Sequence, residues 1–269
     1  WAGFAPLSGI PGTVGAAPVQ NVGAYGAEVA ELIASVRAWD RLRNRVVWLA
    51  LGELGLAYRD SRLKQSLTDT EAGGGRLWGP TGRWVVLDAT FAVRQGSLSS
   101  RIAYSQLAGA LGVELGERVP ERELREAVLE LRRSKGMVLD GADHDTWSAG
   151  SFFTNPILTT AEAELLPEDA PRFPVTDHSQ VVLGTKAAPV IEGLVKTSAA
   201  WLIDHAGFTK GFAVEAGAPA GLSTKHVLAL TNRGGATGTD LARLRDAVVT
   251  GVRKRYGVTL VPEPVQVGF

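Results

Sequence analysis

The sequence has no cysteine among its 269 residues. Disulfide bonds and thiol chemistry are therefore excluded, and the composition suits a reducing compartment, so we expect a cytoplasmic protein. Net charge is absent too, because 28 Lys and Arg residues balance 28 Asp and Glu residues. A protein that binds nucleic acid usually carries a basic excess or patch, so the balance argues against a nucleic-acid partner.

Long apolar runs are also missing. No run is long enough to span a bilayer, so we expect no membrane insertion. The apolar N-terminus lacks the basic region that opens a signal peptide. The chain does contain 45% hydrophobic residues, which is enough to bury a substantial core. At this length we expect two domains.

The most distinctive stretch is residues 8–26, which read Ser-Gly-Ile-Pro-Gly-Thr-Val-Gly-Ala-Ala-Pro-Val-Gln-Asn-Val-Gly-Ala-Tyr-Gly. Glycine allows positive φ and has no Cβ, so such a segment can bring bare backbone against a flat or anionic group. Gln20 and Asn21 add amides, and Tyr25 adds a phenol. A single GxxGxxG pattern would favour a tight structural loop instead, because no strand precedes it and no acidic residue follows at the spacing of a dinucleotide-binding fold.

Three further segments carry polar groups suited to chemistry. Arg59, in the Tyr-Arg-Asp-Ser run at 58–61, has a guanidinium that can grip a carboxylate with two hydrogen bonds, although a polar loop is the plainer interpretation. Ser151 lies in Gly-Ser-Phe-Phe-Thr-Asn-Pro at 150–156, which is not the Gly-x-Ser-x-Gly elbow of hydrolases. A lone serine is usually structural. Glu263 lies between two prolines and by itself would indicate only an exposed glutamate near a terminus.

Together, and in this order, the four segments resemble UDP-N-acetylenolpyruvoylglucosamine reductases, the MurB family. The resemblance extends over residues 8–263 and so over nearly the whole chain. It implies a flavoprotein oxidoreductase of peptidoglycan and cell-wall synthesis. Such an enzyme passes hydride from NADPH to FAD and then to the enolpyruvyl group of a UDP-sugar, giving UDP-N-acetylmuramate. The expected partner is therefore this small UDP-sugar, and a monomer is favoured.

The resemblance also implies roles for individual residues. It assigns catalysis to Arg59 beside the substrate carboxylate, to Ser151 as proton donor, and to Glu263. The residues expected to bind the flavin are Gly9, Ile10, Pro11, Gly12, Thr13, Gly15, Ala16, Ala17, Asn21, Gly23 and Ala24. Those expected to bind the substrate are Tyr25, Tyr104, Lys135, Asn155 and His226. Packing within a helix explains Tyr104 equally well, and a cation at Lys135 also suits a helix C-terminus.

Two features depart from the family pattern. Family members carry a leading segment with a Gly-Gly-Gly-Ser-Asn-type loop around the FAD pyrophosphate, and this chain begins after it. We therefore expect weak or absent FAD retention by the chain alone, restored when the leading segment is supplied. The residues after the catalytic glutamate, Pro264-Val265-Gln266, also differ from the commoner Glu-Val-Arg.

Two other functions remain open on the sequence. One is a nucleotide-sugar binding module that has lost redox activity with its leading segment; the yellow colour of bound flavin would distinguish the two. The other, a serine hydrolase, is weaker because no motif ties a histidine to Ser151. The Asp-His-Asp run at 143–145 could suggest a metal, but no second ligand cluster accompanies it. We expect a solvated loop there and no metal.

The pattern of elements predicts an α+β protein. Strands are expected at 28–40, 45–51, 84–93, 212–215 and 226–232, helices at 102–112, 120–134, 196–207 and 239–256 with Thr239 as a cap, and loops at 66–82 and 161–187. By resemblance, residues 1–136 complete part of a flavin-binding domain of the vanillyl-alcohol-oxidase/PCMH type. Residues 137–259 form a separate α/β substrate domain, and residues 260–269 return to the first.

Overall fold

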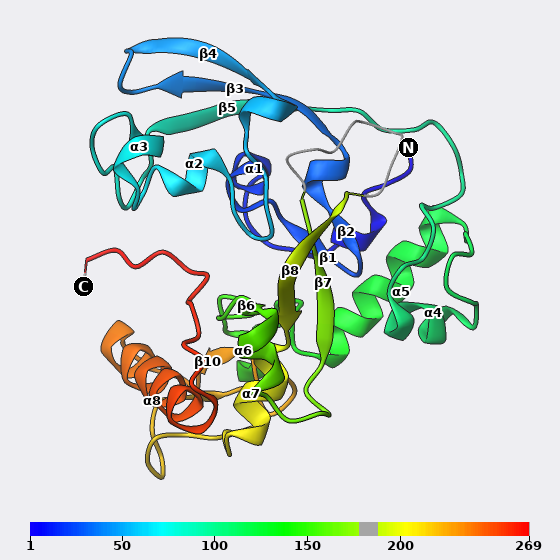
Figure 1. Cartoon of the computed structure of the whole chain (residues 1–269). Coiled ribbons are helices and arrows are strands. Elements are labelled where there is room, and N and C mark those ends of the chain that lie inside the picture. The colour runs from blue at the N-terminus through cyan, green and yellow to red at the C-terminus, as the bar shows by residue number, and fades with distance from the viewer. Residues whose placement is uncertain (178–187, 269) are drawn as a thin grey trace. The chain divides into compact units, whose positions relative to one another are not determined.

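The computed structural model describes residues 1–177 and 188–268 (Figure 1). The chain divides into two compact units, and both contain helices and strands, as an α+β fold requires. The first comprises Trp1–Leu131 and Thr176–Pro189, and the second comprises Arg132–Val175 and Val190–Phe269. The division falls inside one helix, α5 (Glu121–Ser134), close to the boundary expected at residue 136.

The first unit contains a three-stranded sheet made of β3 (Ile33–Asp40), β4 (Arg45–Ala50) and β5 (Trp84–Phe91). The strand order is β4-β3-β5, and β3 pairs antiparallel with both neighbours. The strands expected at 45–51 and 84–93 are confirmed, whereas the one expected at 28–40 begins only at Ile33, because Val29–Glu31 forms a 3-10 helix. The alternation of apolar side chains in β3 turns Val36 and Ala38 into the core, where both are fully buried.

Three short helices lie along one side of this sheet: α1 (Ala17–Gln20), α2 (Arg62–Gln65) and α3 (Thr70–Gly73) (Figure 1). Side-chain oxygens cap the last two, since Ser61 accepts from Lys64 N and Asp69 accepts from Ala72 N, each at 3.0 Å. The segment at 66–82 was expected to be only a loop. That expectation was wrong for α3, because the capping aspartate was not recognised as a helix start.

A buried ion pair fixes the edge of the sheet where β3 ends and β5 begins. Asp40 accepts two hydrogen bonds from Arg83, at 2.9 Å from Nε and 2.7 Å from Nη2. The same carboxylate also accepts from Leu42 N at 3.0 Å and Arg43 N at 3.2 Å. Both charged side chains are almost fully buried, so the pair is satisfied internally rather than by water.

A second core in the first unit forms around α4 (Ser105–Leu111) and the first turns of α5. Both helices were expected from their apolar spacing. The sequence did not predict the small hairpin of β1 (Gly23–Ala24) and β2 (Ala27–Glu28), because its strands are only two residues long. Single-turn 3-10 helices complete the described elements at Ala5–Leu7, Val14–Ala16, Val29–Glu31, Leu51–Glu53 and, in the second unit, His144–Thr146.

The sheet of the second unit has the order β6-β8-β7, with strands β6 (Ile157–Thr159), β8 (Val190–Thr197) and β7 (Arg172–Thr176). Helix α6 (Thr160–Glu164) follows β6. Two expectations were wrong here. The region expected as a loop from 161 contains most of α6 and all of β7; the part of it at 178–187 lies outside the described residues. The helix expected from 196 begins later, because Lys196 and Thr197 end β8 and Ser198 caps α7 (Ala199–His205).

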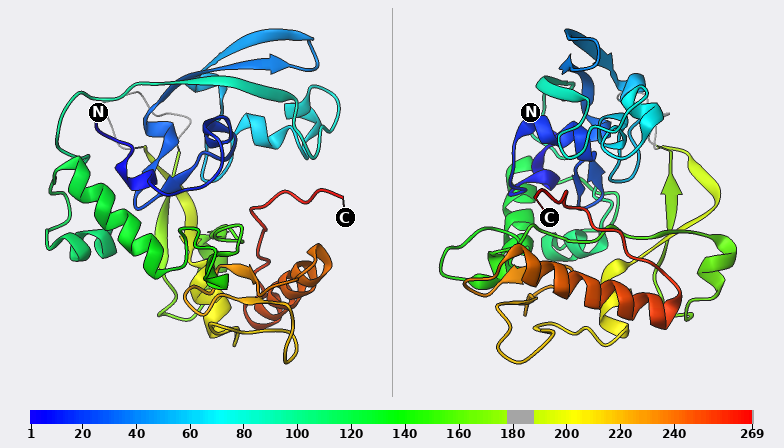
Figure 2. Two further views of the ribbon diagram at one scale, coloured as in Figure 1. Left: turned by 180° about the vertical axis from the view of Figure 1, so that it is seen from behind. Right: turned by 90° about the vertical axis from the view of Figure 1, so that its left-hand side faces the viewer.

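The core of the second unit lies between α7 and the long helix α8 (Gly238–Tyr256), which pack against each other (Figure 2). Thr237, rather than the expected Thr239, caps α8, since its hydroxyl accepts from Asp240 N at 3.3 Å and the Asp240 carboxylate bonds back to Thr237 N at 2.9 Å. Strands β9 (Ala220–Leu222) and β10 (Leu230–Asn232) pair antiparallel and contact α8.

The strand expected at 212–215 is absent from the described structure. Phe212 and Val214 pack against the core without joining a ladder, and the strand lies instead at β9, in the expected loop. The tail also makes its contacts within the second unit: Leu260 is buried in that core and Pro262 forms an antiparallel bridge with Phe153. The expected return of residues 260–269 to the first domain stays a prediction. Which unit serves the flavin and which the substrate stays a prediction.

In the described parts of the chain, no helix is both long enough and apolar enough to cross a bilayer.

Candidate functional site

The glycine-rich segment is open to solvent in its first half. The residues from Pro11 to Val14 are all exposed. Gly12 has a φ of 109°, and a Cβ built on it would meet no heavy atom within 4 Å. The backbone here is therefore bare and approachable, as expected for a segment that lies against a ligand.

The second half of the segment is fixed by Asn21, which is fully buried with a left-handed φ of 44°. Its amide nitrogen donates to Ala57 O and to Glu28 Oε2, both at 2.8 Å, and its amide oxygen accepts from Ala30 N at 3.1 Å. The side chain of Asn21 is thus engaged within the protein. Its expected part in flavin binding would be to shape the segment rather than to contact the ring by its amide.

Arg59 lies against this same segment. It has a left-handed φ of 54°, unusual for a residue with a side chain. Its guanidinium donates to Gly23 O and, at 3.4 Å, to Asn21 O, and it lies 3.6 Å from the Glu28 carboxylate. A Cβ on Gly23 would lie 2.8 Å from Arg59 Nη1, so glycine is required for this approach.

The tetrapeptide around Arg59 is anchored at both ends. Ser61 Oγ donates to Val19 O at 2.6 Å, and Lys64 Nζ donates to Arg59 O at 2.9 Å. The two segments that the sequence marked separately, 8–26 and 58–61, are therefore hydrogen-bonded to each other. Nearby, the rings of Tyr25 and Tyr104 meet edge to face, with centroids 5.6 Å apart. Tyr104 precedes α4 and is partly exposed.

In the second unit, two segments are hydrogen-bonded to the one that bears Ser151, which is itself half-buried. Phe152 N donates to Leu228 O at 2.8 Å, and Phe152 O accepts from Glu263 N at 2.8 Å. Thr154 N donates to Val261 O at 3.1 Å. The serine segment thus lies between the turn that carries His226 and the tail that carries Glu263.

Asn155 follows on the same segment, and its amide oxygen accepts from Ala199 N, at the start of α7, at 3.0 Å. His226 is largely buried. Burial, and then the charges of Lys135 and Lys210, lower the pKa of its imidazole from 6.5 to about 4, so the ring is neutral at pH 7. Burial, followed by the charge of Arg132, also lowers the pKa of Lys135. Thus the charge of Lys135 acts on His226, although the sequence picked the two residues out separately.

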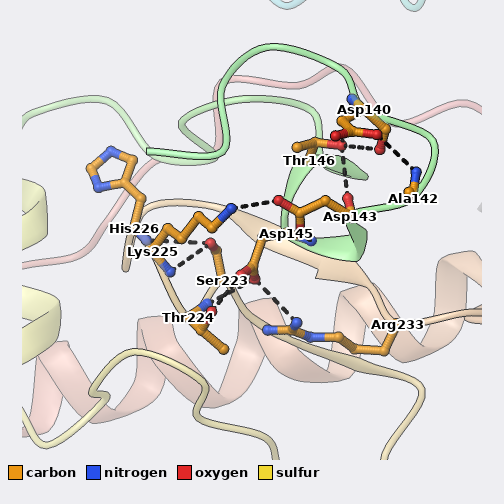
Figure 3. Close-up of polar contacts among 10 residues, drawn as sticks. All are labelled: Asp140, Ala142, Asp143, Asp145, Thr146, Ser223, Thr224, Lys225, His226 and Arg233. Atoms are coloured by element: carbon orange, nitrogen blue, oxygen red, sulfur yellow. Dashed lines mark hydrogen bonds and ion pairs between the residues drawn. The ribbon is translucent and has the colours of Figure 1, made fainter. Parts of the chain in front are cut away.

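The Asp-His-Asp run is not the solvated loop that the sequence suggested. Asp145 is buried, accepts from Thr224 N at 2.8 Å and from the Thr224 hydroxyl, and lies 3.1 Å from Arg233 (Figure 3). Burial raises its pKa, but the Thr224 hydrogen bonds and the Arg233 charge together hold the pKa below 3.8. Asp143 pairs with Lys225. Among the described residues, no group of three His, Asp, Glu or Cys side chains could hold a metal.

An apolar pocket of about 610 Å³ borders the serine segment on the side of Phe152. The residues lining it are Leu139, Gly141, Thr146, Trp147, Ser148, Ala149, Phe152, Leu230, Asn232 and Leu241.

The expected site residues fall into two groups. Arg59, Tyr25, Tyr104 and the residues of the glycine-rich segment belong to the first unit, and Ser151, Asn155, Lys135, His226 and Glu263 belong to the second. Sequence reasoning missed Glu28, which contacts both Asn21 and Arg59, and Asp145. The Asp-x-Asp spacing at 143–145 was visible, but nothing near it in sequence indicated the partners that lie about eighty residues later.

The sequence is similar over its whole length to UDP-N-acetylenolpyruvoylglucosamine reductases. It is 48% identical over 270 residues to the reductase of Thermobifida fusca, an alignment that covers 99% of this chain and 68% of the relative. The chain belongs to the UDP-N-acetylenolpyruvoylglucosamine reductase family. It is 50% identical over 268 residues to the reductase of Cutibacterium acnes, and there it spans all of its own length but 63% of the relative.

Two further comparisons agree with this membership. The family model described as UDP-N-acetylenolpyruvoylglucosamine reductase, C-terminal domain, matches residues 142–267, nearly all of which lie in the second unit. The crystal structure of the reductase from Thermus caldophilus superimposes with a TM-score of 0.52 over 97% of this chain and 63% of that one, at 20% identity. The fold of this family is therefore retained at low sequence identity.

Proposed function

We propose that this chain is part of an enzyme that reduces UDP-N-acetylglucosamine enolpyruvate to UDP-N-acetylmuramate, using FAD and NADPH. The observation that carries the proposal is the hydrogen bond from Glu263 N to Phe152 O at 2.8 Å. It joins the segments that bear a hydroxyl proton donor and a carboxyl group, far apart in sequence. Membership of the reductase family supports the same conclusion.

The residues of the first unit fit a flavin. The exposed backbone around Gly12 leaves room for a ligand, and the hydrogen bonds of Asn21 hold the following turn in place. When bound, FAD would accept hydride from NADPH and deliver it to the enolpyruvyl group. The segment around 9–24 would hold the ring side of the cofactor.

Arg59 would stabilise the charge that develops on the substrate. Addition of hydride to the terminal carbon of the enolpyruvyl group pushes electrons toward C2 and the carboxylate oxygens. A guanidinium fixed in place by Gly23 O and Asn21 O needs little reorganisation to meet that charge. Glu28 Oε1, at 3.6 Å from Arg59 Nη1, would offset part of the positive charge and orient the guanidinium group.

Ser151 would give its hydroxyl proton to C2. Serine is a very weak acid, so the transfer requires a strongly basic carbon and a means of restoring the proton. Lys135, with its lowered pKa, gives up a proton more readily than an ordinary lysine and suits that second task. Glu263, in its protonated form, would donate a hydrogen bond to the developing negative charge.

The test separates the two half-reactions in the protein with its leading segment supplied. In Ser151→Ala, reduction of flavin by NADPH should stay near the wild-type rate. Reoxidation by the UDP-sugar should fall about 10²–10⁴-fold, the usual contribution of a positioned proton donor. Ser151→Cys should recover part of the rate. Ser148→Ala is the matched control, since that hydroxyl caps Gly150 N at 3.2 Å on the same loop.

Stopped-flow absorbance of the flavin measures both steps. Equal slowing of the two half-reactions in Ser151→Ala, or no slowing of reoxidation, would refute the assigned role. The competing function, a nucleotide-sugar binding module, predicts a protein that binds the UDP-sugar without reoxidation of flavin. Yellow protein that turns over the UDP-sugar excludes it.

A further inference from the structure

The turn at 223–226 stabilises its own shape but does not by itself fix its place in the unit. Ser223 Oγ accepts from Lys225 N at 3.0 Å and from His226 N at 3.3 Å, and Ala229 N donates to His226 O at 3.1 Å. All of these bonds stay within 223–229. They define a tight turn after β9 and leave its orientation to other contacts.

Outside contacts come from two backbone amides, Gly211 N to Ser223 O at 3.2 Å and Phe152 N to Leu228 O at 2.8 Å, and from side chains of the loop at 140–146. Asp145 accepts from both the amide and the hydroxyl of Thr224, and Asp143 pairs with Lys225 Nζ (Figure 3). Arg233, at 3.1 Å from Asp145, completes the arrangement from the far end of β10. Two carboxylates thus hold consecutive residues of the turn.

The two aspartates are not equivalent. The side chain of Asp145 is 7% exposed, whereas that of Asp143 is 30% exposed. A buried carboxylate must be matched by hydrogen bonds and charge, and its loss leaves those partners unsatisfied. Exposed pairs such as Asp143 with Lys225 contribute little by comparison. Asp145 is therefore the main attachment.

His226 projects from the opposite side of the turn. In Figure 3 its ring points away from Asp143 and Asp145, whereas Lys225 reaches toward them. The charges of Lys135 and Lys210, together with burial, lower the pKa of this ring. The side-chain contacts at Thr224 and Lys225 hold the two residues that precede His226, so they contribute to where this ring lies.

We infer that Asp145 is a positioning residue, which holds the turn at 223–226 through Thr224 and so sets the place of the His226 imidazole on the side that faces the UDP-sugar. That His226 faces the UDP-sugar rests on the proposed function. That Asp145 holds the turn through Thr224 does not depend on the proposed function. The two parts are therefore tested by separate measurements.

The first measurement follows the His226 ring signals by NMR as pH is varied in the 269-residue chain. In the unaltered chain the imidazole should titrate near pH 4. In Asp145→Asn the turn is loosened and water reaches the ring, so the titration should move upward by at least one pH unit. Asp140→Asn is the matched control and should leave it unchanged, because Asp140 caps Ala142 N at 2.9 Å within its own loop.

The second measurement is made on the protein with its leading segment. Asp145→Asn should raise KM for the UDP-sugar about tenfold, with the rate of flavin reduction by NADPH unchanged. A general loss of fold would also lower the rate of flavin reduction. If Asp145→Asn does not fold, Thr224→Val removes one of the two donors at lower risk, and Thr224→Ser should restore wild-type behaviour.

The outcomes separate the two ideas. An unchanged His226 titration in both Asp145→Asn and Thr224→Val overturns the positioning role. An upward titration with no change in KM overturns the substrate side while the attachment stands. An upward titration with raised KM supports both. If Ser151→Ala leaves reoxidation intact, the proposed function fails independently of the titration.

Discussion

Replacement of Asn21 tests how the flavin segment is held to the arginine segment. Asn21 is fully buried, and its side chain makes three hydrogen bonds, to Glu28, Ala57 and Ala30. Asn21→Ala removes all three and leaves the buried Ala30 N–H without its acceptor. It also places a residue with a Cβ but no compensating amide at a φ of 44°.

The expected loss follows from these two terms. An orphaned buried donor costs about 1–3 kcal/mol, and the left-handed backbone costs a further 1 kcal/mol or so for alanine. We therefore expect the free energy of unfolding of the first unit to fall by roughly 2–4 kcal/mol. Asn21→Gly loses the same hydrogen bonds, but glycine adopts the left-handed conformation without strain. Its free energy of unfolding should therefore fall by about 1 kcal/mol less than that of Asn21→Ala.

Amide hydrogen exchange in β3 and β5 reports unfolding of the first unit alone, so the second unit does not obscure it. Local protection at Ala30 should also disappear in both variants. If Asn21→Ala lowers stability by less than 1 kcal/mol, the hydrogen bonds of Asn21 do not hold this segment. Equal losses for alanine and glycine would show that the left-handed conformation carries no penalty here.

Two further variants test packing and charge, each read by denaturant unfolding against a matched control. Asp40→Asn should lower the free energy of unfolding by about 3 kcal/mol, because the buried Arg83 loses its counter-charge. Its control, Asp88→Asn, removes the half-exposed pair with Arg37 and should lower it by less than about 1 kcal/mol. Similar losses in the two variants would contradict the argument from burial. Gly251→Ala should lower the free energy of unfolding by about 1–2 kcal/mol despite the helix propensity of alanine, since its Cβ would overlap the Phe208 ring. Its control is Gly109→Ala in α4, where the Cβ would meet no atom within 4 Å and stability should rise slightly. A rise in stability at both positions would refute the overlap.

The elements that the sequence predicted well are those with a strong local period. The alternation in β3 and β5 and the apolar spacing in α5 each bury one face, so pattern and structure agree. The elements that it missed are short or lack such a period. The first hairpin strands have two residues each, and α3 depends on one capping aspartate.

Segments with a candidate role were recognisable where their motif is continuous in sequence. The segments at 8–26 and 58–61 were marked separately, and the hydrogen bond from Ser61 Oγ to Val19 O joins them. Partners remote in sequence were beyond reach. Glu28 acquires its role only because the β1–β2 hairpin sets it opposite Gly23, beside Arg59. Asp145 acquires its role only because Thr224 lies beside it in the fold.

His226 makes the stability of the second unit depend on pH in a defined window. Its pKa is about 4 in the folded protein and 6.5 ordinarily, chiefly because burial disfavours the charged ring. Between these values the unfolded chain binds more protons than the folded one, so stability falls as pH is lowered. Each pH unit of difference corresponds to about 1.4 kcal/mol, which gives a loss of about 3 kcal/mol between pH 7 and pH 4.

His226→Gln isolates this contribution, because glutamine does not titrate. The buried carboxylates act in a different window: the pKa values of Asp40 and Asp145 are held below 3.8, so the stability they contribute is present above that pH and is lost only below it. Urea unfolding of the second unit at pH 7, 6, 5 and 4 should therefore show a slope in the wild type that is largely gone in His226→Gln. Parallel curves for the two proteins across this range would mean that the folded protein does not keep this ring neutral, because a ring that protonates equally in both states contributes no slope.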